Sequence, residues 1–289
     1  MLKGALHIHS NISSDSTLSQ SCIKELFKKR GYSFVLLTEH TEDLDSERYE
    51  IIKQEYNSLS DNIFLMISGL EIKWKDKIHF LAYVAKNYMP NEYKLSLGDT
   101  IKKIKKETDC DFLAWGHFNH PFKINKQLMS FASMVDGIEI SNVGYHGQFF
   151  CDWRGLLLLN KLKKAGKATI GIGGLDMHEK TKLGKSYCLI KGLKSPTRNG
   201  IFDAFKSNKV IFKNRFFALG QAKYKISIIA FSLLASVPLD YYKRVRMKVS
   251  RFDDICFDGY IRKYFQVIKR FKGDCYGIYK RIKNNMSGI

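Results

Sequence analysis

The strongest chemical signal in this sequence is the placement of its 8 histidines. His7 and His9 lie two residues apart in LHIHS, at the end of a predicted strand. Side chains two residues apart in a strand lie on the same face, so both rings can approach one ion. Imidazole pairs of this kind are common ligands of transition metals, and Asp15 follows in the polar loop NISSDS. The segment therefore predicts the start of a metal site.

Histidines and carboxylates recur where later predicted strands begin or end. They are His40 in LLTEH, Glu71 in ISGLEI, His79 in KIHFLAYV, His117 and His120 in AWGHFNHP, and Asp176 and His178 in GIGGLDMH. Any one of them, taken alone, is more often a structural or surface residue. The carboxyl ends of strands meet at one face of a βα barrel, so the repeated placement predicts one cluster that binds metal ions.

The elements that would position these residues alternate between short apolar runs and amphipathic stretches. The predicted strands are 5–9, 34–38, 63–71, 79–84, 112–115, 137–140, 168–173 and 187–190, with 63–71 and 79–84 forming a hairpin around Lys75, Asp76 and Lys77. The predicted helices are 19–30, 97–108, 153–165 and 197–207. Repeated alternation favours a mostly parallel sheet, and about seven such units fit a closed barrel better than an open sheet.

The bulk composition is that of an ordinary globular protein. The chain has 289 residues, of which 45% are hydrophobic and 26% charged. Its 6 cysteines form no CxxC pair, which indicates reduced thiols in a reducing compartment. We find no secretory leader and no run of roughly 18 apolar residues. We therefore expect a cytoplasmic protein without a transmembrane segment, with peripheral association at a membrane as an alternative.

The net charge of +20 is unevenly distributed. Residues 206–289 contain 19 Lys and Arg against 5 Asp, so this part carries a net charge of +14 out of the total of +20. We predict a hydrolase domain at 1–212 and a basic, mostly helical C-terminal appendage at 213–289. Such asymmetry indicates an anionic partner, either a membrane surface or a nucleic acid. The alternative is a helix packed on the barrel with a solvated basic face.

The motifs resemble those of the PHP (polymerase and histidinol phosphatase) superfamily. HIHSNISSD, LLTEH, GLEI, FNHP, DGIEISN and GGLDMH occur in the family's order over about residues 3–190. The resemblance implies a distorted (β/α)7 barrel, two or three divalent ions (Zn, Mn or Fe), and hydrolysis of phosphate esters. The metal ligands that it implies are His7, His9, Asp15, His40, Glu71, His79, His120, Asp176 and His178. His120 is preferred to His117 because the family motif places histidine before proline.

The sequence departs from the family pattern at three positions. Glu39 stands where the family usually has aspartate, Ser16 where glycine is usual, and Leu175 where a serine is common. None of these changes removes an implied ligand. The longer carboxylate of Glu39 is expected to support the ligand that follows it.

The expected reaction is attack of a metal-bound hydroxide on the phosphate ester of a small phosphorylated substrate or nucleotide. His178 or Asp15 would assist proton transfer. The residues expected to orient ligands or contact the substrate are Glu39, His117, Glu139, Asn142 and Arg154. Lys185 and Arg198 are further candidates for holding the phosphate, and His146 for lining the pocket.

Three other functions remain open at this point. The basic C-terminal part would suit a 5′-exonuclease or nucleoside bisphosphate phosphatase, although no nucleic-acid motif is recognisable. A noncatalytic, metal-stabilised binding module is a second alternative, against which the apparently complete ligand set argues. A metal-dependent amidohydrolase on a similar barrel is a third, made weaker by the motif order.

Overall fold

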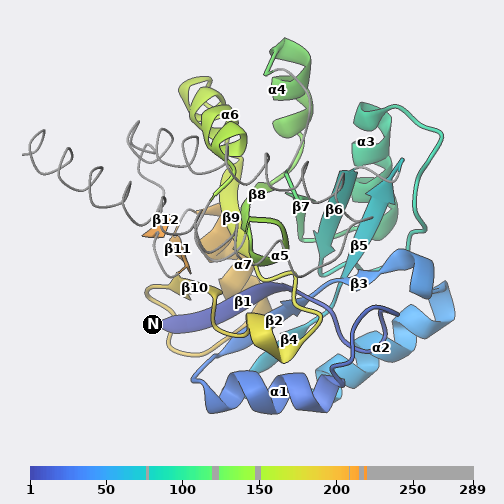
Figure 1. Ribbon diagram of the computed structural model, residues 1–289, viewed down its shortest axis with the longest axis vertical. Coiled ribbons are helices and arrows are strands. Elements are labelled where there is room, and N and C mark those ends of the chain that lie inside the picture. The colour runs from blue at the N-terminus through green and yellow to red at the C-terminus, as the bar shows by residue number, and fades with distance from the viewer. Residues whose placement is uncertain (76–77, 119–123, 147–150, 208, 215–217, 220–289) are drawn as a thin grey trace, which may run out of the picture. The chain divides into compact units, whose positions relative to one another are not determined.

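The computed structural model describes residues 1–75, 78–118, 124–146, 151–207, 209–214 and 218–219, and its described strands form two six-stranded sheets (Figure 1). The first sheet has the order β12-β11-β10-β1-β2-β4. Its strands are β1 (Leu2–Ile8), β2 (Phe34–Leu37), β4 (Leu65–Ile67), β10 (Ser186–Ile190), β11 (Val210–Asn214) and β12 (Ala218–Leu219). The second has the order β3-β5-β6-β7-β8-β9. Its strands are β3 (Glu39–His40), β5 (Gly69–Trp74), β6 (Ile78–Tyr83), β7 (Phe112–Gly116), β8 (Gly137–Asn142) and β9 (Ile170–Gly174).

Helices lie outside the strands and cover them with apolar faces. They are α1 (Gln20–Lys29), α2 (Ser46–Leu59), α3 (Leu97–Thr108), α4 (Lys126–Ala132), α5 (Val143–His146), α6 (Trp153–Lys164) and α7 (Arg198–Lys206). The predicted N-terminus of α1 is correct, because the Ser19 hydroxyl accepts a hydrogen bond from Cys22 N. Helix α1 buries Ile23 and Phe27, one turn apart on the same face. Helix α2 packs on β4 and α1, and α6 packs on β8 and β9 (Figure 1).

The sheets are mixed rather than mostly parallel, which corrects the prediction from the alternation of elements. β1–β2, β2–β4, β3–β5, β7–β8 and β8–β9 are parallel pairs. β5–β6, β6–β7, β1–β10, β10–β11 and β11–β12 are antiparallel. The predicted hairpin accounts for β5–β6, because a connection of a few residues is too short for a parallel crossover.

Two connections of different kinds join the sheets. Single residues, Thr38 and Ser68, separate β2 from β3 and β4 from β5, so neighbouring chain segments pass from one sheet into the other. On the far side, the segment after β9 bonds to the end of β1. There, Leu175 N donates to Leu6 O at 2.9 Å and His9 N donates to Met177 O at 3.0 Å.

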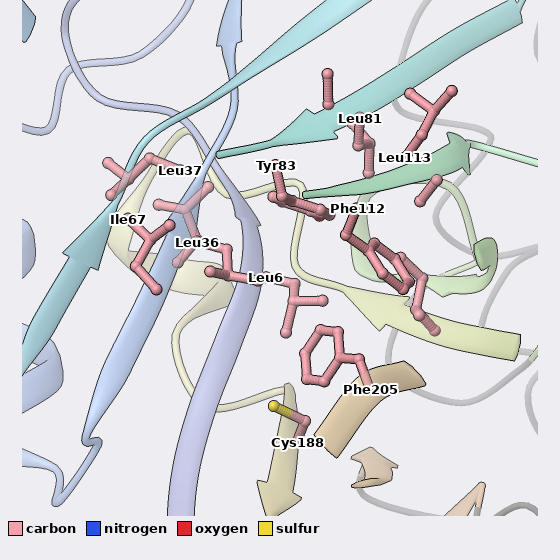
Figure 2. Packing of buried hydrophobic residues seen from close by; sticks show 14 of the residues in the cluster. Leu6, Leu36, Leu37, Ile67, Leu81, Tyr83, Phe112, Leu113, Cys188 and Phe205 are labelled. Atoms are coloured by element: carbon pink, nitrogen blue, oxygen red, sulfur yellow. The ribbon is translucent and has the colours of Figure 1, made fainter. Parts of the chain in front are cut away.

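The apolar core contains buried side chains from strands of both sheets. Figure 2 shows buried side chains from several strands and one helix directed into this core, including Leu6, Leu36, Ile67, Tyr83, Phe112, Cys188 and Phe205. Phe205 of α7 packs edge-on against Phe112 of β7, with ring centroids 5.5 Å apart. This packing fixes the positions of the strands whose ends carry the candidate ligands.

The chain contains described elements that the sequence reasoning did not include. Helices α2 and α4 are the longest of these. Strand β11 crosses the predicted domain boundary at 212/213 and pairs with β10, so residues 213 and 214 continue the first sheet. Most of the predicted basic appendage, residues 220–289, lies outside the described residues. Among the helices that are described, none has the length and apolarity to cross a membrane.

We expect Gly69→Ala to destabilise the fold by about 1–3 kcal/mol, the usual cost of overpacking. A Cβ there would lie 2.8 Å from Leu37 O and 2.9 Å from Ala82 O, and these backbone atoms cannot rotate away. Urea denaturation measures the change. Gly98→Ala is the matched control, because the nearest atom to its Cβ belongs to the movable Phe131 ring, at 3.1 Å. Equal stabilities of the Gly69→Ala variant and the unsubstituted protein would contradict the close packing at β5.

Candidate metal centre

The strand ends bring seven of the predicted ligands together. They are His7 in β1, His9 after it, His40 in β3, Glu71 in β5, His79 in β6, and Asp176 and His178 after β9. His79 opens its strand instead of closing it. Because β6 is antiparallel to β5 and β7, its first residues lie beside their ends, and His79 pairs with Lys73 and Gly116.

Glu71 lies at the middle of the cluster, and its two carboxylate oxygens face different histidines. Its Oε2 lies 3.1 Å from His7 Nε2, 3.1 Å from His9 Nε2 and 3.5 Å from His40 Nδ1. Its Oε1 contacts His79 Nδ1 and lies 3.5 Å from His117 Nε2. The side chain is completely buried. This is the geometry of a carboxylate that can bridge two cations.

Two aspartates lie beside the histidines: Asp176, one of the seven ligands above, and Asp15, a further predicted ligand. Asp176 Oδ1 lies 3.6 Å from His7 Nε2 and 3.7 Å from both His9 Nε2 and His178 Nδ1. Asp15 lies at the rim, where its Oδ2 is 3.1 Å from His178 Nε2 and 3.3 Å from His40 Nε2. The Asp15 side chain is 54% exposed, so this edge of the cluster is open to solvent.

Several sets of three side chains could each hold an ion, since their ligand atoms lie within 4.8 Å of one another. These sets are His7, His9 and Glu71; Glu71, His79 and His117; His9, His40 and His178; and His7, His117 and Glu139. Among the described residues, His9 Nε2, His40 Nδ1 and His178 Nε2 are buried ring nitrogens without a hydrogen-bond partner. Buried polar atoms normally have partners, so convergent unsatisfied nitrogens beside carboxylates fit divalent cations.

The backbone is strained where it presents three of these side chains. His7, His117 and Asp176 have φ values of 59°, 45° and 48°, in the left-handed region that non-glycine residues seldom adopt. At His7 the pairing of β1 with β2 shifts register, which marks a bulge. Simple alternation along a regular strand, the basis of the sequence prediction, is therefore not what brings His7 and His9 together.

Glu139 and Asn142, predicted to orient ligands, lie behind His7. Glu139 Oε1 accepts from His7 Nδ1 at 2.8 Å, and its Oε2 accepts from His117 N and from Asn142 Nδ2, each at 2.9 Å. Gly174 makes room for this carboxylate, because a Cβ there would lie 1.8 Å from Glu139 Oε1. A carboxylate on the far ring nitrogen of a histidine is the usual support of a metal ligand.

The residues that depart from the family pattern have partners in the structure. Glu39 does not reach the ligand atoms; it accepts from Ser10 N at 3.1 Å and from Ser13 Oγ at 2.6 Å. The single proton of Ser16 Oγ is shared between His9 O and His178 O, at 3.0 and 3.1 Å, and so links the Asp15 loop to the segment after β9. Leu175 is buried in the core.

The choice between His117 and His120 is not decided, because His120 lies outside the described residues. His117, the less favoured of the two from the sequence, faces the cluster: its Nε2 lies 3.5 Å from Glu71 Oε1 and 3.7 Å from Asp176 Oδ2. The sequence signal for His117 was its place directly after β7, where a strand-end ligand is expected.

Sequence reasoning missed Lys182 as a cation at the cluster. Its Nζ donates to the backbone carbonyl of Asp176. By contrast, Arg198 donates to Asn57 at the surface. Lys185 lies in the loop before β10, and Arg154 is the second residue of α6. The signal that could have found Lys182 is its place in the same loop as Asp176 and His178.

The electrostatics favour an added positive charge among the carboxylates. Burial alone would lower the pKa of His7, but the charges of Glu139, Glu71 and Asp176 raise it well above 6.5. Burial lowers the pKa of His9 to about 4, and burial also lowers the pKa values of His117 and His178. Three of these four imidazoles are thus held neutral, the form that binds metal.

Comparison with solved structures finds PsfC from Pseudomonas syringae PB-5123, with 14% sequence identity and a TM-score of 0.50, covering 84% of this chain and 98% of that chain. Another solved structure is an amidohydrolase from Chromobacterium violaceum with bound sulfate and no metal, at 12% identity and a TM-score of 0.41, covering 61% and 87%. No family model and no curated protein matches the sequence. Similarity at 14% identity shows a shared fold and does not assign a reaction.

We expect the metal-free protein, kept free of ions by a chelator, to be most stable near pH 6.5, which is about the pKa of an unperturbed histidine. The raised pKa of His7 contributes stability below that pH, which is lost as pH rises through its folded pKa. The lowered pKa values of His9, His117 and His178 act in the opposite sense, because the folded protein excludes protons that the unfolded chain binds as pH falls. Thermal unfolding between pH 5 and 9 measures the profile.

Added divalent ions should remove the loss of stability on the alkaline side, because a cation then replaces the proton that His7 gives up. The same series with a chelator throughout is the control. A melting temperature that rises steadily with pH in the chelated protein would contradict the assignment of the His7 proton.

Proposed function

We propose that this chain is a metal-dependent phosphoesterase that holds two or three divalent ions in the cluster around Glu71. The observation that carries the proposal is the position of the Glu71 carboxylate, whose two oxygens face separate groups of histidines. Pairs of cations linked by a carboxylate suit phosphate ester hydrolysis, in which charge develops on both attacking and leaving oxygens. The order of the PHP-like motifs adds to this support.

The ligand set fits Zn, Mn or Fe, because imidazole nitrogens are mixed with carboxylate oxygens. When bound, such ions polarise a phosphoryl oxygen and lower the pKa of a coordinated water. The chain's own residues supply the rest. His178 and Asp15 face each other at the exposed rim, 3.1 Å apart. Burial lowers the pKa of His178 and keeps the ring neutral. Where no ion occupies its Nε2, that nitrogen is able to take up a proton at this edge, with Asp15 stabilising the imidazolium.

We also propose that the strands form the distorted barrel typical of the PHP superfamily. The chain segments that pass from one sheet into the other, at Thr38 and Ser68, support a continuous wall on one side. The backbone hydrogen bonds from Leu175 and Met177 to the end of β1 support closure on the other. The basic segment 213–289 remains a proposed contact for a membrane surface or a nucleic acid.

His9→Ala and Asp176→Ala should each lower phosphatase activity by on the order of 10³-fold or more, since each removes a ligand side chain. The measurement is metal content followed by turnover on a panel of small phosphate mono- and diesters, nucleotides and 5′-phosphorylated oligonucleotides. Asp203→Asn, an exposed carboxylate on α7, is the matched control and should leave the activity unchanged. Full activity in both alanine variants would refute the mechanism, as would a metal-loaded protein that hydrolyses nothing in the panel.

Lys182→Ala should raise the KM for a phosphorylated substrate by about tenfold, equivalent to about 1.4 kcal/mol, with a smaller effect on kcat. Lys182 is tethered to the carbonyl of Asp176, so its ammonium group lies at the edge of the site where an anionic substrate would enter. Lys180→Ala, an exposed lysine of the same loop, provides the comparison. An unchanged KM in Lys182→Ala would remove this residue from substrate binding.

A further inference from the structure

A chain of buried hydrogen bonds lies behind His9, on the side of the ring away from Glu71. His9 Nδ1 lies 3.3 Å from Ser13 Oγ. That hydroxyl lies 2.6 Å from Glu39 Oε2 and accepts from His40 N at 3.0 Å. His9, Ser13 and Glu39 are all completely buried, so water does not substitute for any of these contacts.

Counting hydrogens fixes the direction of every bond at Ser13. A serine hydroxyl has one proton to donate and two lone pairs that accept. The proton goes to Glu39 Oε2, the closest acceptor. One lone pair accepts from the backbone N–H of His40, which can only donate. The second lone pair faces His9 Nδ1, so this nitrogen must carry the hydrogen.

Glu39 is held as an acceptor by donors on both of its oxygens. Ser10 N donates to the carboxylate at 3.1 and 3.2 Å, and the Tyr56 hydroxyl donates to Oε1. Burial raises the pKa of Glu39, and the hydrogen bonds from Ser13, Tyr56 and Ser10 act against that rise by favouring the ionised carboxylate. The Ser10 hydroxyl, 3.2 Å from Tyr56 Oη, is placed to donate to that oxygen in turn. With Glu39 ionised and accepting from Ser13, the whole chain has one consistent arrangement of protons.

We infer that Ser13 is a positioning residue that fixes His9 with its hydrogen on Nδ1, leaving the Nε2 lone pair directed at the metal centre, and that Glu39 orients Ser13. His9 Nε2 has no hydrogen-bond partner among the described residues and lies 3.1 Å from Glu71 Oε2. The inference rests on the proposed metal centre. It also distinguishes the two histidines of HIHS: Glu139 supports His7 directly, whereas a carboxylate supports His9 through a serine.

The test combines ring-nitrogen NMR with metal titration on the full chain. In long-range ¹H–¹⁵N spectra, metal-free and zinc-loaded wild-type protein should both show His9 protonated on Nδ1. Ser13→Ala should give a mixture of the two tautomers without metal and a 10–100-fold weaker affinity for zinc, the usual effect of losing such support. Ser14→Ala is the matched control: the neighbouring serine is exposed and should leave the tautomer and the affinity unchanged.

Two outcomes would overturn the inference about Ser13, and a third would refute only the proposed metal centre. Wild-type protein with His9 protonated on Nε2 would overturn the inference even if Ser13→Ala failed to fold. A folded Ser13→Ala variant with wild-type tautomer and zinc affinity would overturn it as well. Wild-type protein that showed the Nδ1 tautomer but bound no zinc would refute the proposed metal centre and leave the positioning of His9 by Ser13 intact.

Discussion

The structure depends on burying a carboxylate among imidazoles without leaving its charge uncompensated. Glu71 is fully buried, and its neighbours Asp176 and Glu139 add further negative charge within a few ångströms of His7. Transferring such groups out of water is costly unless opposite charge compensates them. The charge of His7, together with hydrogen bonds from His7 and His79, keeps the pKa of Glu71 low despite its burial. Cations in the same place would provide stronger compensation, so metal binding at this site would also stabilise the fold.

The fold meets this constraint by mixing strand directions. The antiparallel β6 carries His79 at its start to the edge where parallel strands end, so a residue from the opposite end of a strand joins the cluster. The bulge at His7 and the left-handed conformation of Asp176 then aim two side chains that regular strands would direct elsewhere. Such local strain persists only where the surrounding packing enforces it, and the densely filled core below the site provides that packing.

Much of this arrangement could be predicted from sequence, and the parts that could not have a common physical cause. Short apolar runs gave most strands within a few residues, but the stretch 63–71, predicted as one strand, is divided at Ser68 into β4 and β5, which belong to different sheets. Strand ends gave His7, His9, His40, Glu71, Asp176 and His178 as neighbours in space. Helix α2 was missed because its apolar face is narrow, with Tyr49, Ile52 and Tyr56 buried among charged residues. The antiparallel pairs, the bulge and the contacts of Ser13 and Lys182 arise from tertiary packing, which local patterns do not encode.

The Ser16 hydroxyl links the backbone carbonyls of His9 and His178. Ser16 and His178 are separated by 162 residues along the chain. The first histidines leave the ribosome early, whereas the loop that completes the site is made near the end of the described domain. Contacts over such sequence distances form late and slowly. A nascent chain therefore exposes His7 and His9 before it has a pocket for them, so any capture of ions by the proposed metal centre would follow translation of the domain.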